Sequence, residues 1–134
     1  MNAARDDALI GRVRATGLAV TVRTEGAAGD LPAGIDTSAY RIVQEALTNI
    51  IKHARANTAQ VTLHYGPQEL VIDIIDDGQA ADPAADGVHN AGRGIIGMRE
   101  RVALYGGSLT ARPRPDGGFQ IHARFPLPPL GPPS

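Results

Sequence analysis

Residues 40–54 read YRIVQEALTNIIKHA and contain the pattern that decides the fold. Their apolar residues recur at intervals of three and four, as they do along the buried side of a helix. Asp36, Thr37 and Ser38 precede the pattern and offer side-chain oxygens that can cap a helix. We therefore expect one long helix to begin at these capping residues and to end near Ala54. Its predicted core residues are Ile42, Val43, Ala46, Leu47, Ile50 and Ala54.

A polar stripe runs beside this apolar side. At about 100° per residue, Glu45, Asn49, Lys52 and His53 fall within one arc of the helix. A carboxamide can ligate a hard cation, an ammonium can bind phosphates, and a carboxylate can accept a proton. The stripe could thus hold a metal ion and the phosphates that it bridges. Taken alone, however, such residues more often form a solvated helix face.

The rest of the chain predicts strand pairs alternating with helices. Mixed sheets of this kind are covered by helices on one face, so we expect an α+β fold, a two-layer α/β sandwich with a mostly antiparallel sheet. Residues 1–127 should form one domain, and the proline-rich residues 128–134 a disordered tail. The expected elements are a helix over 5–14, a strand over 18–23, a hairpin of 61–65 and 70–75, a loop over 79–94, a helix from Ile95 to Gly106 and a hairpin of 108–112 and 119–125.

Composition narrows the function classes. The 134 residues are enough for one core, and 13 Lys and Arg nearly balance 14 Asp and Glu. Such a balance gives no broad positive field for nucleic acid or for an anionic membrane surface. Cysteine is absent, which excludes disulfides, thiol nucleophiles and sulfur-ligated zinc. We expect a soluble domain that contacts neither nucleic acid nor membrane.

The second polar motif, IIDDG, occupies residues 74–78 at the end of a very apolar strand. A carboxylate at that place, Asp76, can accept a hydrogen bond from an exocyclic amine such as that of adenine. Gly78 leaves room for a flat ring. By itself, Asp-Asp-Gly is also a common turn sequence.

The third motif, GRGIIGMRERV, occupies residues 92–102. We expect its glycine-rich turn to lead directly into a helix, where free N–H groups and the helix dipole favour a phosphate. The order of residues fits neither a Walker P-loop nor a dinucleotide fingerprint. A glycine-rich turn alone is weak evidence, but the three motifs together supply a metal site, a base site and a phosphate cover.

In this order the three motifs resemble the N box, the first glycine box and the second glycine box of the GHKL ATPase superfamily. The sequence is most similar to sensor histidine kinases that have a Gly-Met-Arg-Glu-Arg second glycine box and are paired with LuxR-type response regulators. The similarity extends over residues 18–127. It implies the Bergerat ATP-binding fold, with ATP and Mg²⁺ as cofactors.

The resemblance also implies roles for individual residues. Asn49 would coordinate Mg²⁺, Glu45 would act on the phosphoacceptor as the catalytic carboxylate, and Lys52 and His53 would line the phosphates. Asp76 would bind the adenine amino group, beside Gly78. The lid over the phosphates would be shaped by Gly92, Arg93, Gly94, Ile95 and Gly97.

By the same resemblance, the γ-phosphoryl group of ATP passes to a histidine on a separate dimerisation domain of the same kinase, and a LuxR-type response regulator is an indirect partner. The expected location is the cytoplasm, either free or as the cytosolic part of a membrane-anchored sensor. Two alternatives stay open, a non-catalytic ATP-gated interaction module and an anti-sigma-type serine kinase of the same superfamily. The sequence departs from the family pattern at Gln79 and Ala80 in the first glycine box, and at Phe119, where a Thr link to Asp76 is expected to be lost.

Overall fold

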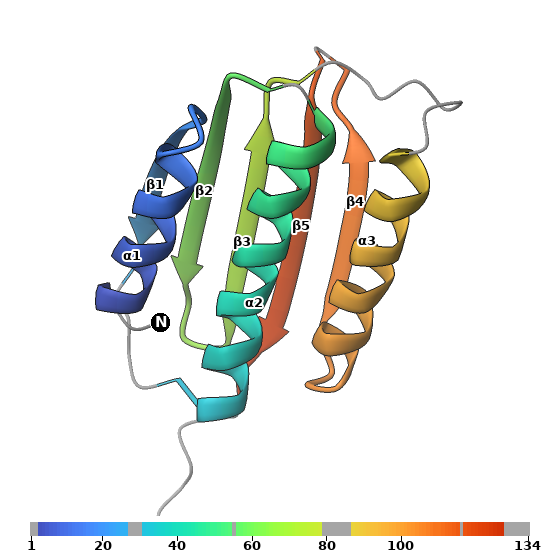
Figure 1. Ribbon diagram of the computed structural model, residues 1–134. Helices are drawn as coiled ribbons and strands as arrows, with labels where there is room; N and C mark the ends of the chain where they lie inside the picture. Colours follow the sequence, from blue (N-terminus) through green and yellow to red (C-terminus); the bar gives the residue numbers. More distant parts are fainter. Residues whose placement is uncertain (1–2, 27–30, 55, 79–86, 116, 128–134) are drawn as a thin grey trace, which may run out of the picture.

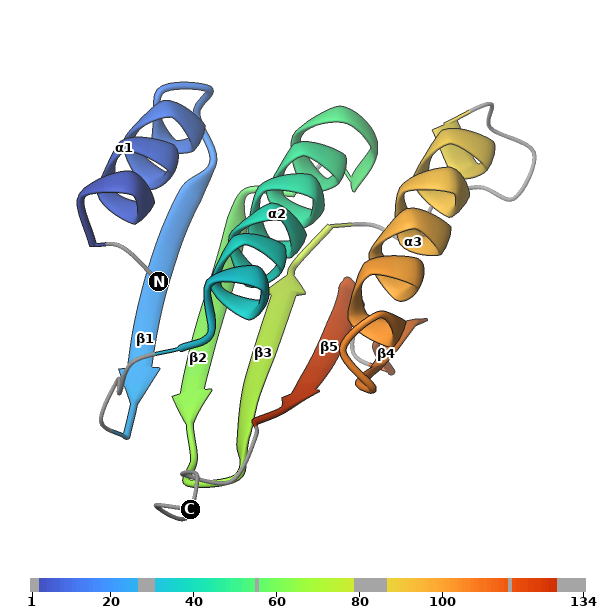
Figure 2. The ribbon, with the colours of Figure 1, turned by 90° about the horizontal axis from the view of Figure 1, so that it is seen from below.

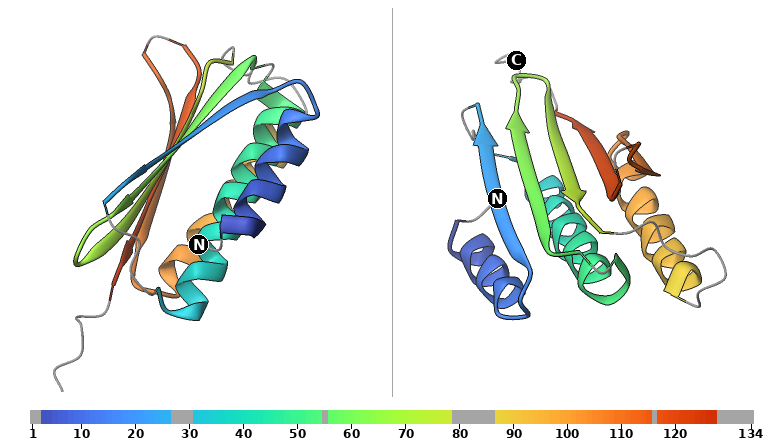
Figure 3. Two further views of the ribbon diagram at one scale, coloured as in Figure 1. Left: turned by 90° about the vertical axis from the view of Figure 1, so that its left-hand side faces the viewer. Right: turned by 90° about the horizontal axis from the view of Figure 1, so that it is seen from above.

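The chain is organised in two layers, a sheet and a set of helices that cover one of its faces (Figures 1 and 3). The computed structural model describes residues 3–26, 31–54, 56–78, 87–115 and 117–127. The predicted tail, residues 128–134, and residues 79–86 lie outside them. The elements are α1 (Ala3–Arg14), β1 (Ala19–Glu25), α2 (Ala33–Asn49), the π-helix η1 (Ile50–Ala54), β2 (Thr58–Tyr65), β3 (Glu69–Asp76), α3 (Gly87–Ala103), β4 (Ser108–Pro113) and β5 (Phe119–Pro126).

The sheet has five strands in the order β1-β2-β3-β5-β4. Only the β1–β2 pair is parallel, and the three other pairs are antiparallel. The expected mixed, mostly antiparallel sheet is therefore confirmed, as are both hairpins. Figure 2 shows α1, α2 and α3 side by side on the same face of this sheet.

The core lies between the two layers, and the alternation of buried and more exposed residues along β2 and β3 builds much of it. In β3, Leu70, Ile72, Ile74 and Asp76 are buried toward the helices, while the residues between them are only half-buried. The predicted apolar side of α2 faces them: Ile42, Ala46 and Leu47 are fully inaccessible to solvent. No helix in the described ranges combines the length and the hydrophobicity needed to cross a membrane.

The predicted start of the long helix is wrong. The helix begins at Ala33 after Pro32, and no side chain caps its first turn. Proline is well suited to a helix start because its fixed φ matches the helix and its missing N–H needs no partner. Asp36, Thr37 and Ser38 lie inside the first turns instead, where the carboxylate of Asp36 interacts favourably with the helix dipole.

The predicted start of the last helix is also wrong. Helix α3 begins at Gly87, eight residues before the expected Ile95, so that residues 87–94 are helical and only part of the expected loop can be a loop. Glycine is a poor helix former, and the cluster of glycines therefore indicated a turn. Packing against α2 outweighs this preference, because Gly94 lies directly on that helix.

Three motif-bearing segments meet at one end of the sandwich. Helix α2 and strand β3 both end there, and α3 begins there, beside the hairpin between β4 and β5 (Figure 1, top). These segments are far apart in the sequence, but the fold brings them to the same edge of the two layers. The candidate site is built from them.

Candidate functional site

The first and third motifs touch at Gly94. A Cβ atom built on Gly94 would lie 2.8 Å from Asn49 Nδ2 and 2.9 Å from Glu45 Oε1. Both side chains are half-buried and come from adjacent turns of α2. Because glycine has no side chain, α3 can cross α2 at a distance that leaves the carboxylate and the carboxamide next to the same backbone atom. The structure therefore brings Glu45, Asn49 and Gly94 together, as a single site requires.

The polar stripe continues into an irregular turn. After Asn49 the helix widens into η1, which carries Lys52 and His53. Lys52 is exposed to solvent, and the side chain of His53 lies outside the described part of the chain. A π-helical turn holds an extra residue, so the constant 100° step that placed all four residues in one arc does not apply beyond Asn49. Such turns are frequent at functional sites.

Asp76 ends β3 on the inner face of the sheet and is only 4% exposed. Its Oδ1 accepts a hydrogen bond of 2.8 Å from the N–H of Gly78. Burial raises the pKa of this carboxyl group above its ordinary value, although backbone hydrogen bonds from Gly78 and Phe119 oppose the shift. A buried carboxylate with a raised pKa at the end of a strand is a frequent feature of binding sites.

At Phe119, the side-chain link to Asp76 that was expected to be lost is replaced by a backbone hydrogen bond. Phe119 pairs with Asp76 across β3 and β5, and its backbone, in place of a side chain, hydrogen-bonds the carboxylate. Gly118 precedes it with a φ of +89°, and a Cβ there would lie 1.9 Å from the backbone oxygen of Asp76. Sequence reasoning took Gly118 for an ordinary turn residue. The glycine pair was the available signal that a backbone approaches closely at this point.

Asp77 is a second residue that sequence reasoning missed. Its Oδ1 accepts hydrogen bonds of 2.9 Å from the backbone N–H groups of both Asn57 and Thr58. Hydrogen bonding, first of all from the Thr58 backbone, lowers the pKa of Asp77. Asn57 lies between η1 and β2, and Thr58 is the first residue of β2, so that Asp77 joins the end of β3 to the segment that follows the polar stripe.

The third motif does not form the helix N-terminus that was predicted. Residues 92–97 lie inside α3, where most backbone N–H groups are used within the helix, and the first free ones belong to the turn at Gly87. Ile95 is half-buried against the core, and Gly97 has open space where a Cβ would stand. The side chain of Arg93 and the surroundings of Gly92 lie outside the described part of the chain.

Residues 34–129 match the family described as histidine kinase-, DNA gyrase B- and HSP90-like ATPase. The chain belongs to this family. The matched span contains α2, β3 and α3, and so includes all three motifs of the site.

Curated relatives of this chain include sensor histidine kinases. The chain is 38% identical over 113 residues to the sensor histidine kinase YxjM of Bacillus subtilis, and 30% identical over 112 residues to the histidine-protein kinase/phosphatase DegS of Brevibacillus brevis. Each alignment covers 84% of this chain but only 27% and 28% of the relative. The histidine-protein kinase/phosphatase UhpB of Salmonella typhimurium is 42% identical over 71 residues, which are 53% of this chain and 14% of the relative.

Solved structures confirm the fold. The ATP-binding domain of PrrB from Mycobacterium tuberculosis superimposes with a TM-score of 0.66 at 20% identity, covering 93% of both chains. The mycobacterial sensor histidine kinase MprB gives 0.66 at 21% identity, covering 95% of both chains, and AdeS of Acinetobacter baumannii gives 0.70 at 11% identity, covering 92% of this chain and 64% of that one. The predicted Bergerat-type sandwich is thereby confirmed.

Proposed function

We propose that this ATPase domain binds Mg-ATP at the shared end of α2, β3 and α3, and that it donates the γ-phosphoryl group to a histidine on a separate dimerisation domain of the same kinase. The contact of Gly94 with both Glu45 and Asn49 carries the proposal. It joins two motifs that are more than forty residues apart into one polar surface, at the end of the sandwich where Asp76 is buried.

Asp76 is the proposed receptor of the base. Its carboxylate faces the helix layer and is held by backbone donors on either side, so that its orientation is fixed before a ligand arrives. An adenine amino group offers a donor that suits this acceptor, and Gly78 leaves the approach open. Burial makes the hydrogen bond strong, because few water molecules compete for it.

Magnesium fits the donor set on α2. In nucleotide sites Mg²⁺ uses one or two protein oxygens and completes its octahedron with phosphate oxygens and water. The carboxamide oxygen of Asn49 would be such a ligand, beside Lys52 on the next turn. Within the described ranges there is no cluster of three His, Asp or Glu side chains that could hold a metal by itself. A metal held jointly by Asn49 and the phosphates agrees with this composition.

Glu45 is the proposed catalytic carboxylate. During transfer, the bond between the γ-phosphorus and the bridging oxygen of ATP breaks, a bond from phosphorus to an imidazole nitrogen forms, and ADP leaves. The side chain of Glu45, one helical turn before Asn49, would accept a hydrogen bond from the other imidazole nitrogen and stabilise the positive charge that develops on the ring. Positioning and electrostatic stabilisation supply the rest of the catalysis.

The two histidines whose side chains the structure describes, His64 and His122, lie away from the proposed site. His64 and His122 lie on the outer face of the sheet, where they pair with Glu25 and Asp73. That face is opposite the helices that carry Glu45 and Asn49. A histidine-bearing dimerisation domain is therefore the proposed phosphoacceptor, and a LuxR-type response regulator the proposed indirect partner, working in the cytoplasm.

Two measurements test the proposal. The domain, mixed with the dimerisation domain of its own kinase, should incorporate phosphate from labelled ATP into the histidine of that partner. Binding of Mg-ATP without any transfer would contradict the kinase function. For the metal ligand, Asn49→Ala should lose most of the gain in ATP affinity that Mg²⁺ gives the unsubstituted domain, and a variant whose affinity still responds fully to Mg²⁺ would remove Asn49 from that role.

A further inference from the structure

Asp77 lies where three segments of the proposed site converge. It directly follows Asp76, the proposed base receptor. Its carboxylate binds Asn57 and Thr58, and its own N–H donates to the backbone oxygen of Thr58 at 3.3 Å. On the other side, a Cβ built on Gly118 would lie 3.3 Å from its Cα. Although Asp77 is exposed, it is thus fixed by contacts from two neighbouring segments.

The segment that Asp77 holds is the continuation of the polar stripe. Asn49 is the last residue of α2, and η1 with Lys52 follows immediately. A π-helical turn is wider and less regular than an α-helical one, and it depends on tertiary contacts for its stability. Only a few residues separate η1 from β2. Because this link is short, the position of β2 constrains the position of η1. Fixing Asn57 and Thr58 therefore restrains where η1 ends.

We infer that Asp77 is a positioning residue, which holds the phosphate end of the nucleotide site, Asn49 and Lys52, in a fixed place relative to the base receptor Asp76. The inference rests on the proposed function. This role requires no contact of Asp77 with the base or the phosphates. Asp77 acts through the hydrogen bonds that it accepts from two backbone amides, because these bonds connect the end of β3 to the segment that follows the long helix.

The hydrogen bonds, more than the charge, carry this role. Both amides donate to the same atom, Oδ1, and an asparagine retains an acceptor oxygen at that place. The charge of an exposed carboxylate is largely screened by water. Asp77→Asn should therefore keep the connection, whereas Asp77→Ala removes it and leaves the two amides to water.

The test compares Mg-ATP with adenosine, which has the base but no phosphates. Calorimetry should show that Asp77→Ala weakens Mg-ATP binding roughly three- to tenfold, the equivalent of one or two ordinary hydrogen bonds, while adenosine binding changes less than twofold. Asp77→Asn should restore Mg-ATP binding to within about twofold of the unsubstituted domain. Asp73→Ala is the matched control, because it removes a hydrogen-bonded carboxylate from the outer face of β3, the strand that Asp77 directly follows, and it should change neither affinity.

Unchanged Mg-ATP binding in Asp77→Ala would overturn the inference. Equal losses for Mg-ATP and adenosine would also overturn it, since they would indicate a general structural role. Failure of the unsubstituted domain to bind Mg-ATP would instead overturn the proposed function. Amide hydrogen exchange of the nucleotide-free protein separates the two cases: Asn57 and Thr58 should exchange faster in Asp77→Ala than in Asp77→Asn, and equal rates would show that Asp77 does not restrain them.

Discussion

Two aspartates of β3 show how one strand can serve two purposes. Asp73 and Asp76 are three residues apart and therefore point to opposite faces of the sheet. Asp73 faces outward, where His122 Nδ1 lies 2.8 Å and Gln120 Nε2 lies 3.0 Å from its Oδ1. Asp76 faces the helices, is buried, and accepts hydrogen bonds from the backbone groups of Gly78 and Phe119.

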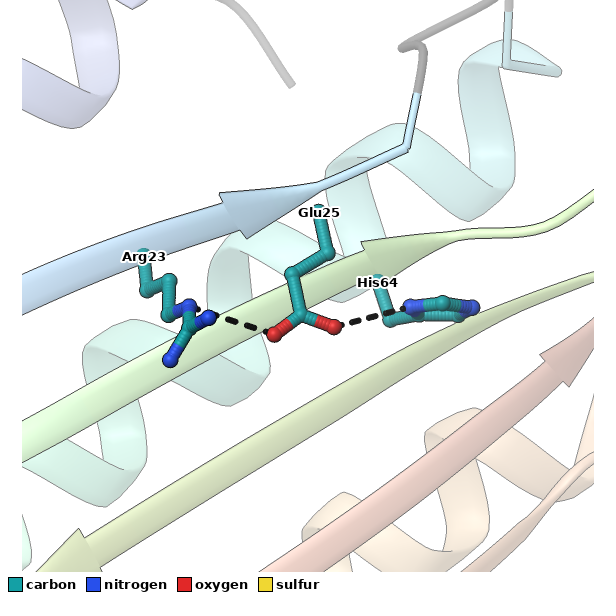
Figure 4. A network of polar contacts seen from close by, with 3 residues as sticks. All are labelled: Arg23, Glu25 and His64. Atoms are coloured by element: carbon teal, nitrogen blue, oxygen red, sulfur yellow. Dashed lines mark hydrogen bonds and ion pairs between the residues drawn. The ribbon is translucent and has the colours of Figure 1, made fainter.

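On the outer face of the sheet, acidic side chains pair with neighbouring basic side chains. Glu25 lies between Arg23 and His64, at 3.2 Å and 3.3 Å, and all three side chains are substantially exposed (Figure 4). Arg124 pairs with Glu69 in the same manner. Exposed pairs of this kind contribute little to stability, about 0 to 1 kcal/mol each. At the inner end, by contrast, acidic and amide groups gather around a glycine backbone, and this arrangement suits a ligand that brings its own cation and phosphates.

The largest effect is expected at Glu45. Glu45→Gln keeps the size of the side chain but replaces a proton acceptor by a neutral amide, so phosphoryl transfer to the dimerisation domain should slow by about 10²- to 10⁴-fold. Mg-ATP affinity should change only a few-fold, because the proposed role of Glu45 concerns the acceptor. Quantifying phosphohistidine over time at saturating ATP measures the rate. An unaltered rate would show that Glu45 is not the catalytic carboxylate.

Asp76 should come next. Asp76→Asn is expected to weaken ATP binding by about 1.5–3 kcal/mol, or roughly 10- to 100-fold, because a charged acceptor for the amino group is lost. Calorimetry with ATP is the measurement. GTP, which has a carbonyl group at the corresponding position of the base, should bind poorly to the unsubstituted domain. An unchanged ATP affinity would refute the assignment of the base receptor.

Asp76→Asn should weaken ATP binding, but it should stabilise the folded state of the nucleotide-free domain at pH 7. The folded pKa of Asp76 is raised above its ordinary value, so the folded state holds the proton more tightly than the unfolded state does. Stability from this group is therefore lost as the pH rises through the window between the two pKa values, and the loss is complete above it. Asp76→Asn should melt higher than the unsubstituted domain at pH 7 without nucleotide, and this advantage should shrink in acid. A lower melting temperature at pH 7 would contradict the pKa shift.

Gly94 should give a smaller, localised effect. In Gly94→Ala the new methyl group displaces the ends of two flexible side chains, Asn49 and Glu45, so we expect Mg-ATP affinity to fall roughly three- to tenfold while the fold survives. Gly11→Ala is the matched control, since Gly11 also lies in a helix but has no neighbour within 4 Å of a built Cβ. Its binding should be unchanged and its stability slightly higher. Equal binding in both variants would show that the Gly94 contact has no role in the site.

Much of the fold could be predicted from local patterns, and the failures have local causes. A very apolar run located β3, and the three-to-four spacing located α2, because a buried face imposes its period on the sequence of a helix. The start of α2 was misjudged because Asp36, Thr37 and Ser38 are typical capping residues, whereas the helix begins directly after Pro32. The start of α3 was misjudged because glycine clusters usually indicate turns, whereas Gly94 permits a helix–helix contact that no local pattern reveals.

The residues with distinctive chemistry in the site could be predicted from the sequence, but the residues that position them could not. Side chains with distinctive chemistry, such as Glu45, Asn49 and Asp76, could be selected from the sequence. Asp77 could not, because its role depends on two backbone amides twenty and nineteen residues away, and any residue can supply an amide. The π-helical turn was hidden for a similar reason, since its sequence continues the helical period. The individual binding and catalytic roles stay predictions that the variants above can test.

The smallest effect is expected on the outer face. Asp73→Ala removes the acceptor shared by His122 and Gln120, both of which can turn to water, so the free energy of unfolding should fall by only about 0.5–1.5 kcal/mol. ATP affinity and phosphoryl transfer should stay within twofold of the unsubstituted domain, because the inner face of β3 and the helices above it are untouched. Chemical denaturation and calorimetry on the same preparation measure both quantities. If Asp73→Ala weakened ATP binding as much as Asp76→Asn, the face on which an aspartate lies would not decide its role, and the division between a self-paired outer surface and a ligand-binding inner end would fail.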